Sequence, residues 1–520
     1  QGVLPLAGGK KYQLKAALKS DSPAGGPVRI SLTAGECILF QTEELPVTAE
    51  WQVFEFSFFC EEQAESTLWI TTMHSGSFTV GMVSLMPADH WLGMRRDVVE
   101  HLREIGTTML RWPGGNFAGE YRWRDGLLPA DLRAPLQSFM EMETQPFSHG
   151  FDNNELGTDE IVALCREIGA EPYFTINLAW GTPEESAAWV EYCNGSADTP
   201  MGRLRAERGH AAPYQVKFWS LGNEMGYGHM EGPNSPDAYR ITAGRHAEAM
   251  RNVSPDILLC GSAPQPSREW IEKVNAPMAA EVPWISHHAY EKSRMAFSTP
   301  EEIRRTYEEA LVLLGYFDRR MAELRSLLPD TLKISFDEWN LWYAWYRNPG
   351  VLDGIVTGSI LHWLLRNAER YGVASACYFQ PVNEGAIRVE PYGSRLTATG
   401  QLMRIFSRHA GGTIVEELTD ETRFATRRAD GSLYITICNL SFDRTAEYLL
   451  PLAAENAELE LLTPDGLRPG SRFRESSGRP GQPAIRLAPL SFAAIRLPPE
   501  KKDDVTKEAK CRNIKLPEEE

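Results

Sequence analysis

The spacing of hydrophobic and polar residues in the first part of the chain differs from that in the middle. Between residues 10 and 86, short apolar runs such as Val28–Thr33 and Trp51–Phe59 alternate with clusters of Gly, Pro, Ser and Glu. Strand-length runs at intervals of about ten residues are typical of a β-sandwich. The pattern predicts a sandwich over residues 1–87. Most of its aromatic residues are expected in the core, although they could also line a carbohydrate cleft.

From residue 88 the pattern changes to helices and strands in alternation. A helical period over Thr158–Ile168 leads into the apolar run Pro172–Leu178, and Pro236–Asn252 leads into Ile257–Cys260. Such alternation predicts a parallel sheet covered by helices, and strands that are apolar on both faces are typical of a barrel. We therefore expect an α/β fold, a (β/α)8 barrel, over residues 88–411.

The strand count falls one short of a complete barrel. Seven strands are predicted, and the series opens with a helix at about residues 90–105, although a barrel opens with a strand. We expect the first strand to belong upstream of residue 1, with a run within residues 1–87 as the alternative source. The seven strands would leave a gap between the strands that end near Trp112 and Gln380. We expect either an incomplete or strained barrel there, or a replacement segment from residues 1–87 or from a neighbouring chain.

The end of the chain returns to short β-type runs. Residues 412–497 alternate apolar segments with Gly, Pro and Asp turns, which predicts a second, C-terminal β-sandwich. The tail, residues 498–520, is rich in Lys and Glu with little apolar content and is predicted to be disordered.

Composition and charge exclude two classes of partner. No apolar run approaches the roughly 18–20 residues that a membrane span needs, so no membrane is expected. The formal net charge is −17, with 70 Asp and Glu against 53 Lys and Arg. An acidic surface repels phosphate backbones, which argues against nucleic acid. A neutral oligo- or polysaccharide fits this charge.

The eight cysteines are scattered along the chain and form no CxxC pair. Buried free thiols are the expected state, which is typical of a reducing compartment and favours a cytoplasmic over a secreted location. The chain begins at Gln1 with neither an initiator Met nor a signal pattern. Removal of a leader and a fragmentary chain are both consistent with this start.

Candidate chemistry appears at the carboxyl ends of two predicted barrel strands, where barrel enzymes place their catalytic groups. Glu224 closes the segment 221–224 and Glu338 lies in the segment 337–340, each directly after a buried apolar run. Two carboxyl groups across one pocket are what glycosidic hydrolysis needs. One protonates the leaving oxygen, and the other attacks the anomeric carbon or activates water.

Simpler explanations exist for each part of this pattern. A lone Asn223–Glu224 pair can cap a helix, and Asp337–Glu338 can form a salt bridge. His287–His288 suggests zinc, but adjacent strand residues point to opposite faces, and no further His or Cys lies at metal spacing. No metal or other cofactor is therefore expected. The placement of the two glutamates three strands apart in one barrel favours the catalytic interpretation.

Three segments carry a family resemblance. Residues 111–116 (RWPGGN), 221–225 (LGNEM) and 337–343 (DEWNLWY) resemble, in order and spacing, the signature segments of glycoside hydrolase family 51 in clan A. The similarity extends from about residue 85 to 497. Residues 10–86 resemble the carbohydrate-binding-type sandwich that some members insert after barrel strand one.

The resemblance implies a retaining, metal-independent α-L-arabinofuranosidase that releases terminal arabinofuranosyl residues from arabinoxylan or arabinan. By the match, Glu224 would be the acid/base and Glu338 the nucleophile. Members often form hexamers or dimers, so a homo-oligomer is a possible assembly. The residues that would bind or enclose the sugar are Asn116, Asn223, His288, Tyr290 and Trp342.

Because of three departures from the family pattern, the sequence predicts the type of reaction better than it predicts the substrate. The strand-one Glu has no counterpart, a Gln expected after strand eight falls near Val389, and a Trp is replaced around residues 149–151. An endo-β-1,4-glucanase or xylanase with the same catalytic pair is therefore one alternative. A non-catalytic carbohydrate-binding protein is another, although the presence of both glutamates argues against it.

Overall fold

The structure is a computed structural model of the whole chain. The chain divides into two compact units, residues 1–404 with 467–471, and residues 405–466 with 472–520. The residues that the structure describes are 3–21, 26–72, 76–137, 151–226, 231–262, 266–292, 297–342, 347–450, 456–480 and 484–499.

Residues 4–87 form two antiparallel sheets, as the strand-length runs predict. One sheet has the order β1–β7–β3–β4 with β5 paired to β3, and the other has the order β6–β2–β8. Inward-facing apolar residues of both sheets meet in one core, including Leu14 and Leu18 of one and Ile30 and Leu32 of the other. The strands are β1 (Leu4–Leu6), β2 (Lys10–Ser20), β3 (Gly26–Ala34), β4 (Cys37–Gln41), β5 (Leu45–Val47), β6 (Gln52–Cys60), β7 (Ala64–Thr71) and β8 (Phe78–Pro87).

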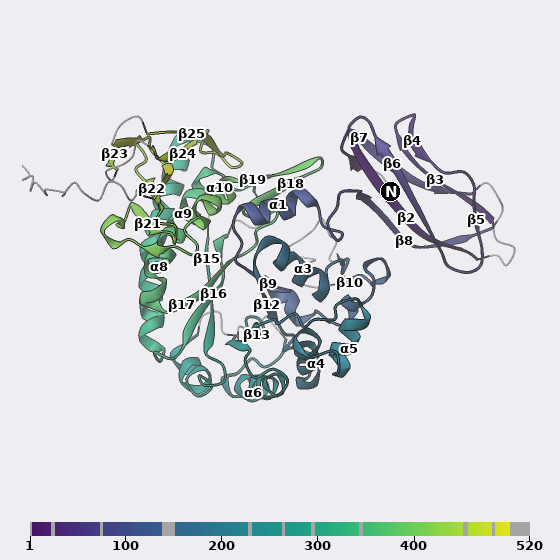
Figure 1. Cartoon of the computed structure of the whole chain (residues 1–520), viewed down its shortest axis with the longest axis horizontal. Helices are drawn as coiled ribbons and strands as arrows, with labels where there is room; N and C mark the ends of the chain where they lie inside the picture. Colours follow the sequence, from purple (N-terminus) through teal and green to yellow (C-terminus); the bar gives the residue numbers. More distant parts are fainter. Residues whose placement is uncertain are drawn as a thin grey trace, which may run out of the picture. The chain divides into compact units, whose positions relative to one another are not determined.

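A seven-stranded parallel sheet follows, in the order β17–β16–β15–β14–β13–β12–β9. Helices connect successive strands and surround the sheet (Figure 1), which confirms the barrel class. The strands are β9 (Met109–Trp112), β12 (Glu171–Thr175), β13 (Phe218–Leu221), β14 (Leu258–Gly261), β15 (Trp284–Lys292), β16 (Lys333–Trp342) and β17 (Val373–Tyr378).

The starts of several helices follow from a shared local signal. Thr182, Ser235 and Thr299 each accept a backbone N–H at a helix start, and each is followed by Pro, whose fixed φ suits the first helical turn. None of the helices in the described ranges is long and apolar enough to cross a membrane. The helices are α1 (Arg96–Glu104), α3 (Thr158–Ile168), α4 (Pro183–Asn194), α5 (Pro200–Glu207), α6 (Pro236–Val253), α7 (Arg268–Trp270), α8 (Pro300–Leu327), α9 (Val351–Tyr371) and α10 (Ala398–Ser407).

The two ends of the parallel sheet are β9 and β17, as the strand count predicts. The two strands lie near each other, with backbones within 8 Å, but no ladder joins them in the described residues. No described strand of residues 4–87 pairs with either of them, so the alternative source of an eighth strand is not observed. An apolar cluster, here called the seam cluster, instead spans this gap. It contains Val99, Leu102, Ile105, Leu164, Ile168, Ala386, Ile387, Leu396 and Met403, with Leu110 of β9 and Tyr378 of β17 packed against it.

An irregularity in β16 has consequences for the site. Ser286 of β15 pairs with Ser335 of β16, and His288 pairs with Glu338, so β16 carries one more residue than β15 between these pairs. This is a β-bulge, which re-aims side chains locally. In a regular strand, the adjacent side chains of Asp337 and Glu338 would point to opposite faces of the sheet. Because of the bulge, both contact the same polar network.

The second unit is also β-rich, which agrees with the predicted C-terminal sandwich. It contains a six-stranded sheet, β20–β21–β22–β27–β24–β25, and the pair β23–β26. Of the predicted disordered tail, residues 500–520 lie outside the described residues. The strands are β20 (Thr413–Ile414), β21 (Arg423–Arg427), β22 (Leu433–Asn439), β23 (Ala446–Leu449), β24 (Glu458–Pro464), β25 (Phe473–Gly478), β26 (Ala484–Leu487) and β27 (Ser491–Leu497).

The cysteines that the structure describes are all free thiols, as expected. Most are buried, but Cys37 is exposed and Cys377 is partly buried. Cys511 lies outside the described residues.

Candidate active site

The carboxyl ends of β13, β15 and β16 bring the two predicted catalytic glutamates together. Glu224 follows β13, while Glu338 lies in β16 beside His288 of β15. A carboxylate oxygen of Glu224, a ring nitrogen of His288 and a carboxylate oxygen of Glu338 all lie within 4.8 Å of one another. The strand-end argument from the sequence therefore places both carboxyl groups at one point of the barrel.

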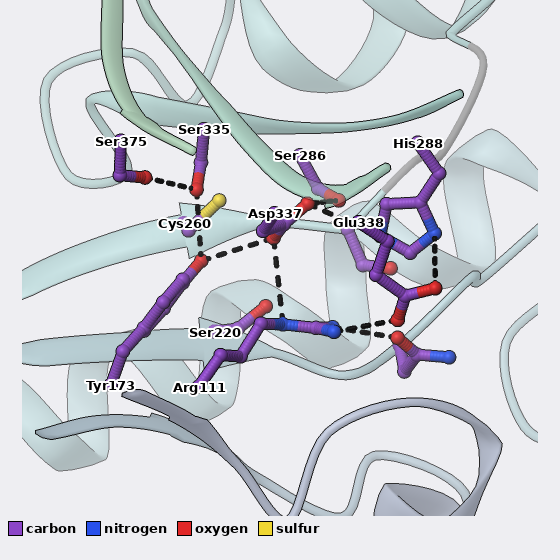
Figure 2. Close-up of polar contacts among 12 residues, drawn as sticks. Arg111, Tyr173, Ser220, Cys260, Ser286, His288, Ser335, Asp337, Glu338 and Ser375 are labelled. Carbon is purple, nitrogen blue, oxygen red and sulfur yellow. Dashed lines mark hydrogen bonds and ion pairs between the residues drawn. The ribbon is translucent and has the colours of Figure 1, made fainter. Parts of the chain in front are cut away.

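Glu338 is held on both of its carboxylate oxygens. Arg111 donates from Nη1 to Oε1 at 2.6 Å, and the Tyr290 hydroxyl donates to Oε2 at 2.5 Å. Only 4% of the Glu338 side chain is exposed, and 5% of that of Arg111. Figure 2 shows the guanidinium of Arg111 between Asp337 and Glu338. Charge-assisted bonds of this kind stabilise the ionised carboxylate and fix its orientation.

Asp337 is a second buried carboxylate in the same network. Ser286 donates to its Oδ1 at 2.7 Å, and the Tyr173 hydroxyl donates to its Oδ2 at 3.2 Å. Arg111 Nε lies 3.7 Å from Oδ2 (Figure 2). Burial raises the pKa of Asp337, but the charges of Arg111 and His288 outweigh this and hold its pKa below the usual value. Asp337 therefore favours its charged form, which pairs with Arg111 and His288.

His288 bridges the three carboxylates. Its Nδ1 lies 2.9 Å from Glu224 Oε1 and 3.2 Å from Glu338 Oε2, and its Nε2 lies 3.1 Å from Asp337 Oδ1. Burial lowers the pKa of His288, but the surrounding carboxylates raise it to about 10. The imidazole is therefore protonated at neutral pH. His287 faces the other way and stacks on Phe336 with ring centroids 5.5 Å apart, as strand alternation predicts.

Glu224 occupies a tight turn after β13. Its φ is +50°, and the preceding Gly222 has φ +84°, both in the left-handed region. Met225 donates its backbone N–H to Ser262 Oγ at 3.1 Å, which anchors the far side of the turn. A left-handed non-glycine residue costs free energy and persists only where its surroundings fix it. The turn thereby directs Glu224 toward His288, with 14% of its side chain exposed.

Two asparagines extend the network from Arg111. Arg111 donates from Nη2 to Asn223 Oδ1 at 2.6 Å, and Asn223 Nδ2 donates to Asn116 Oδ1 at 3.2 Å. Asn116 begins a short 3-10 turn, η1 (Asn116–Gly119), after β9. Asn116, Asn223, His288 and Tyr290, which the sequence assigned to sugar binding, therefore lie in one connected group with the two glutamates.

The aromatic residues near the strand ends have different positions. Trp339 is 2% exposed, and Trp112 packs against Tyr121 with ring centroids 4.7 Å apart, so both are packing residues. Trp180 is 72% exposed. Trp342 ends β16, but its side chain lies outside the described residues, as do Tyr343 and Trp345.

Sequence reasoning named Arg111 and Asp337 but assigned neither to the site. Each is a charged residue in a barrel strand with its side chain buried, and a buried charge needs a partner. The need for a partner would have predicted that Arg111 and Asp337 form an ion pair. The bulge beside Asp337 could not be predicted from the pattern of hydrophobic residues.

The same cluster is the only group of three potential metal ligands found in the described residues. His288 contacts three carboxylates, and Arg111 donates to Glu338 from within the same group. The donor set therefore suits ion pairing better than metal binding. The metal-independence expected from the sequence stays a prediction.

Comparisons with known proteins agree with this geometry. The family described as "Alpha-L-arabinofuranosidase 1 domain" matches residues 101–308. "Probable alpha-L-arabinofuranosidase C" of Aspergillus clavatus is 34% identical over 268 residues, which cover 48% of this chain and 51% of the relative. "Intracellular exo-alpha-(1->5)-L-arabinofuranosidase" of Streptomyces lividans is 32% identical over 332 residues, 58% of this chain and 48% of that one. The chain thus spans about half the length of these curated relatives.

Solved structures extend the similarity over more of the chain. The Thermotoga maritima α-L-arabinofuranosidase in complex with arabinose is 26% identical with a TM-score of 0.66, covering 78% of this chain and 90% of that chain. The thermostable GH51 α-L-arabinofuranosidase of Thermotoga petrophila is 27% identical with a TM-score of 0.66, covering 79% of this chain and 92% of that chain.

Proposed function

We propose that this chain, which is similar in sequence and fold to the α-L-arabinofuranosidases of glycoside hydrolase family 51, is a retaining glycoside hydrolase of the same specificity. In this proposal Glu338 is the nucleophile and Glu224 the acid/base. The substrate is a terminal α-L-arabinofuranosyl residue of an arabinoxylan- or arabinan-type glycan. The Streptomyces relative, named as an exo-acting α-(1→5) enzyme, supports removal of terminal residues.

The separation of the two carboxyl groups carries the proposal. Oxygens of Glu224 and Glu338 lie within 4.8 Å of each other. Retaining enzymes place their carboxyl groups about 5–5.5 Å apart, whereas inverting enzymes need about 6.5–9.5 Å to fit a water molecule. The short separation supports direct attack by a carboxylate over activation of water.

In the first step, a carboxylate oxygen of Glu338 forms a bond to the anomeric carbon as the bond to the leaving oxygen breaks. Arg111 and Tyr290 orient the attacking carboxylate. The leaving oxygen takes a proton from the Glu224 carboxyl group, which lies in contact with the protonated His288. The product of this step is a glycosyl ester on Glu338.

In the second step, water replaces the leaving group. Glu224, now ionised, removes a proton from the water molecule. At the same time the water oxygen bonds to the anomeric carbon, and the ester bond to Glu338 breaks. Asn116 and Asn223, bonded to one another beside Glu224, supply amide groups for the sugar hydroxyls. The sequence of events returns both carboxyl groups to their starting protonation states.

The proposed function is tested by measuring hydrolysis of an arabinofuranoside and the anomeric configuration of the product. Nitrophenyl α-L-arabinofuranoside should be hydrolysed, and proton NMR of the first product should show the α-anomer of arabinose. First formation of the β-anomer would exclude retention. A fall in the viscosity of a β-glucan or xylan without release of arabinose would favour the endo-acting alternative. Absence of turnover on any glycoside would favour the non-catalytic one.

The absence of a metal requirement is tested separately. After incubation with EDTA and removal of the chelator by gel filtration, kcat on nitrophenyl arabinofuranoside should stay unchanged, because Arg111 and His288 supply the positive charge of the site. A loss of activity that zinc or another divalent cation restores would contradict this. The free thiols support a reducing compartment as the proposed location, and a homo-oligomer remains a proposal for size-exclusion chromatography.

A further inference from the structure

A pocket of about 790 Å³ lies beside the catalytic group. Its walls come from the segment that follows β9, from the residues after β12 and from the start of α4. It shares Asn116 with the catalytic group, and Glu231, from the segment after Glu224, also lines it. A volume in this range is typical of small-molecule sites, so the pocket can hold part of a substrate.

The pocket has one exposed aromatic wall that the chain holds in place. Trp180 lines it, and the tryptophan is 72% exposed. Asn177 Oδ1 accepts the backbone N–H groups of Ala179 and Trp180, both at 3.0 Å. A Cβ at Gly181 would lie 2.2 Å from the Asn177 carbonyl oxygen, so this tight turn requires glycine. The loop thus presents a large flat ring in a defined place, and such a ring can stack on the C–H face of a sugar.

A carboxylate residue also lines the pocket. Glu120, which follows η1, contributes to its wall. A carboxylate accepts hydrogen bonds, so Glu120 can bind a hydroxyl group of a ligand. Glu185, another lining residue, accepts from Trp123 Nε1 at 3.2 Å and from Arg124 Nε at 2.8 Å, which fixes this part of the wall.

The charge of the lining restricts the class of ligand. Four carboxylates and two guanidinium groups line the pocket, so negative charge is in excess: Glu120, Asp125, Glu185 and Glu231 against Arg122 and Arg124. A uronic acid or a phosphate would be repelled, whereas a neutral sugar offers hydroxyl donors without charge.

We propose that this pocket is a subsite for a neutral sugar unit of the substrate beyond the one that is cleaved, with Trp180 as the stacking platform and Glu120 as a hydroxyl acceptor. The inference rests on the proposed function, and it predicts that the enzyme prefers neutral oligosaccharides over simple glycosides of arabinofuranose.

The experiment compares two substrates in the full chain. One is a neutral arabino-oligosaccharide of three units, and the other is methyl α-L-arabinofuranoside, whose methyl group is too small to reach the pocket. The kcat/KM of the unaltered chain should be at least about tenfold higher on the trisaccharide, which corresponds to about 1.4 kcal/mol. Trp180→Ala and Glu120→Gln should each reduce this ratio several-fold.

The control is Ile241→Ala on α6, which truncates an apolar side chain that is 50% exposed outside the pocket. It should leave the ratio unchanged. Equal kcat/KM on both substrates, or a ratio that neither pocket variant lowers, would overturn the subsite. So would an uronic-acid-bearing trisaccharide that is cleaved as well as the neutral one. Failure of the unaltered chain to cleave either substrate would instead overturn the proposed function.

Discussion

The ends of β13 and β16 hold the same functional group in two different ways. Glu338 lies within a regular strand next to a bulge, and Arg111 and Tyr290 each bind one of its oxygens. Glu224 lies in a left-handed turn, more exposed, and contacts the proton-bearing His288. The first environment fixes the orientation of a carboxylate that is almost fully enclosed, and the second leaves the carboxyl group more open to a substrate. Environment therefore distinguishes two chemically identical side chains.

The largest effect is expected at Glu338. Glu338→Gln removes the attacking oxygen but keeps the shape, so kcat should fall about 10⁴-fold or more, equivalent to about 5.5 kcal/mol. The fall should be similar for natural oligosaccharides and for nitrophenyl arabinofuranoside, because both need the covalent step. A thermal melt of the variant serves as the folding control. Residual activity within tenfold of the unaltered chain would remove Glu338 from the nucleophile role.

Glu224 should respond differently to substrate chemistry. Glu224→Ala should slow natural linkages by about 10²–10⁴-fold, because their leaving oxygen needs a proton. Nitrophenyl arabinofuranoside, with its good leaving group, should be much less impaired, and azide should restore turnover by replacing water in the second step. Equal losses on both substrates with no response to azide would contradict the assignment.

Arg111 connects the two environments, and its loss should affect both stability and rate. Arg111→Met removes a buried positive charge that pairs with Asp337 and Glu338, which should cost about 3–5 kcal/mol of unfolding free energy. Urea unfolding measures this. Adding Asp337→Asn should recover part of the stability but not the activity, since Glu338 still lacks the Arg111 hydrogen bond that orients it. If Arg111→Met unfolds at the same urea concentration as the unaltered chain, the ion pairs contribute nothing.

The smallest effect is expected at a third carboxyl group, which differs from Glu224 and Glu338 in its surroundings. Glu384, in the segment after β17, is 2% exposed, and neither of its oxygens has a partner in the described residues. Burial alone raises its pKa from 4.5 to about 8. The folded chain therefore binds this proton more tightly than the unfolded chain, so stability should fall as the pH rises from 4.5 to 8.

Glu384→Gln should remove that part of the pH dependence and be more stable than the unaltered chain at pH 9, by on the order of 2 kcal/mol. Thermal melts between pH 5 and 9 measure the difference. Glu100→Gln, at an exposed position on α1, is the matched control and should leave the profile unchanged. Parallel profiles for the Glu384 variant and the unaltered chain would contradict the prediction.

The sequence predicted the main elements because their signals are local. Helix α3 (Thr158–Ile168) has the predicted bounds, and α6 ends one residue later than predicted. Ser235 and Pro236 mark the start of α6. Helix α1 begins at Arg96, later than the expected start near residue 90, because Leu92 and Gly93 have positive φ and form a turn. Helix α5 was missed because its apolar pattern is weak, although Thr199–Pro200 marks its start.

The position of both glutamates followed from strand ends, but their environment did not. Residues 111 and 337 are separated by most of the barrel, so their contact depends on sheet closure. The hairpin of β18 (Ile387–Glu390) and β19 (Gly393–Leu396) was also missed, as was its packing in the seam cluster. Non-local contacts of this kind leave no periodic pattern in a single sequence.

The seam cluster has a consequence for the order of events during synthesis. Ser394 in β19 donates to Asp97 of α1 across 297 positions of sequence, and Arg95 bonds the Glu390 carbonyl across 295. These contacts, and the apolar cluster around them, cannot form until the last barrel strand has left the ribosome. Loop closure over such a length is entropically costly and slows folding. Until then, the strands already synthesised have one unpaired edge. Unpaired strand edges promote aggregation, so the chain should aggregate most readily during this part of its synthesis.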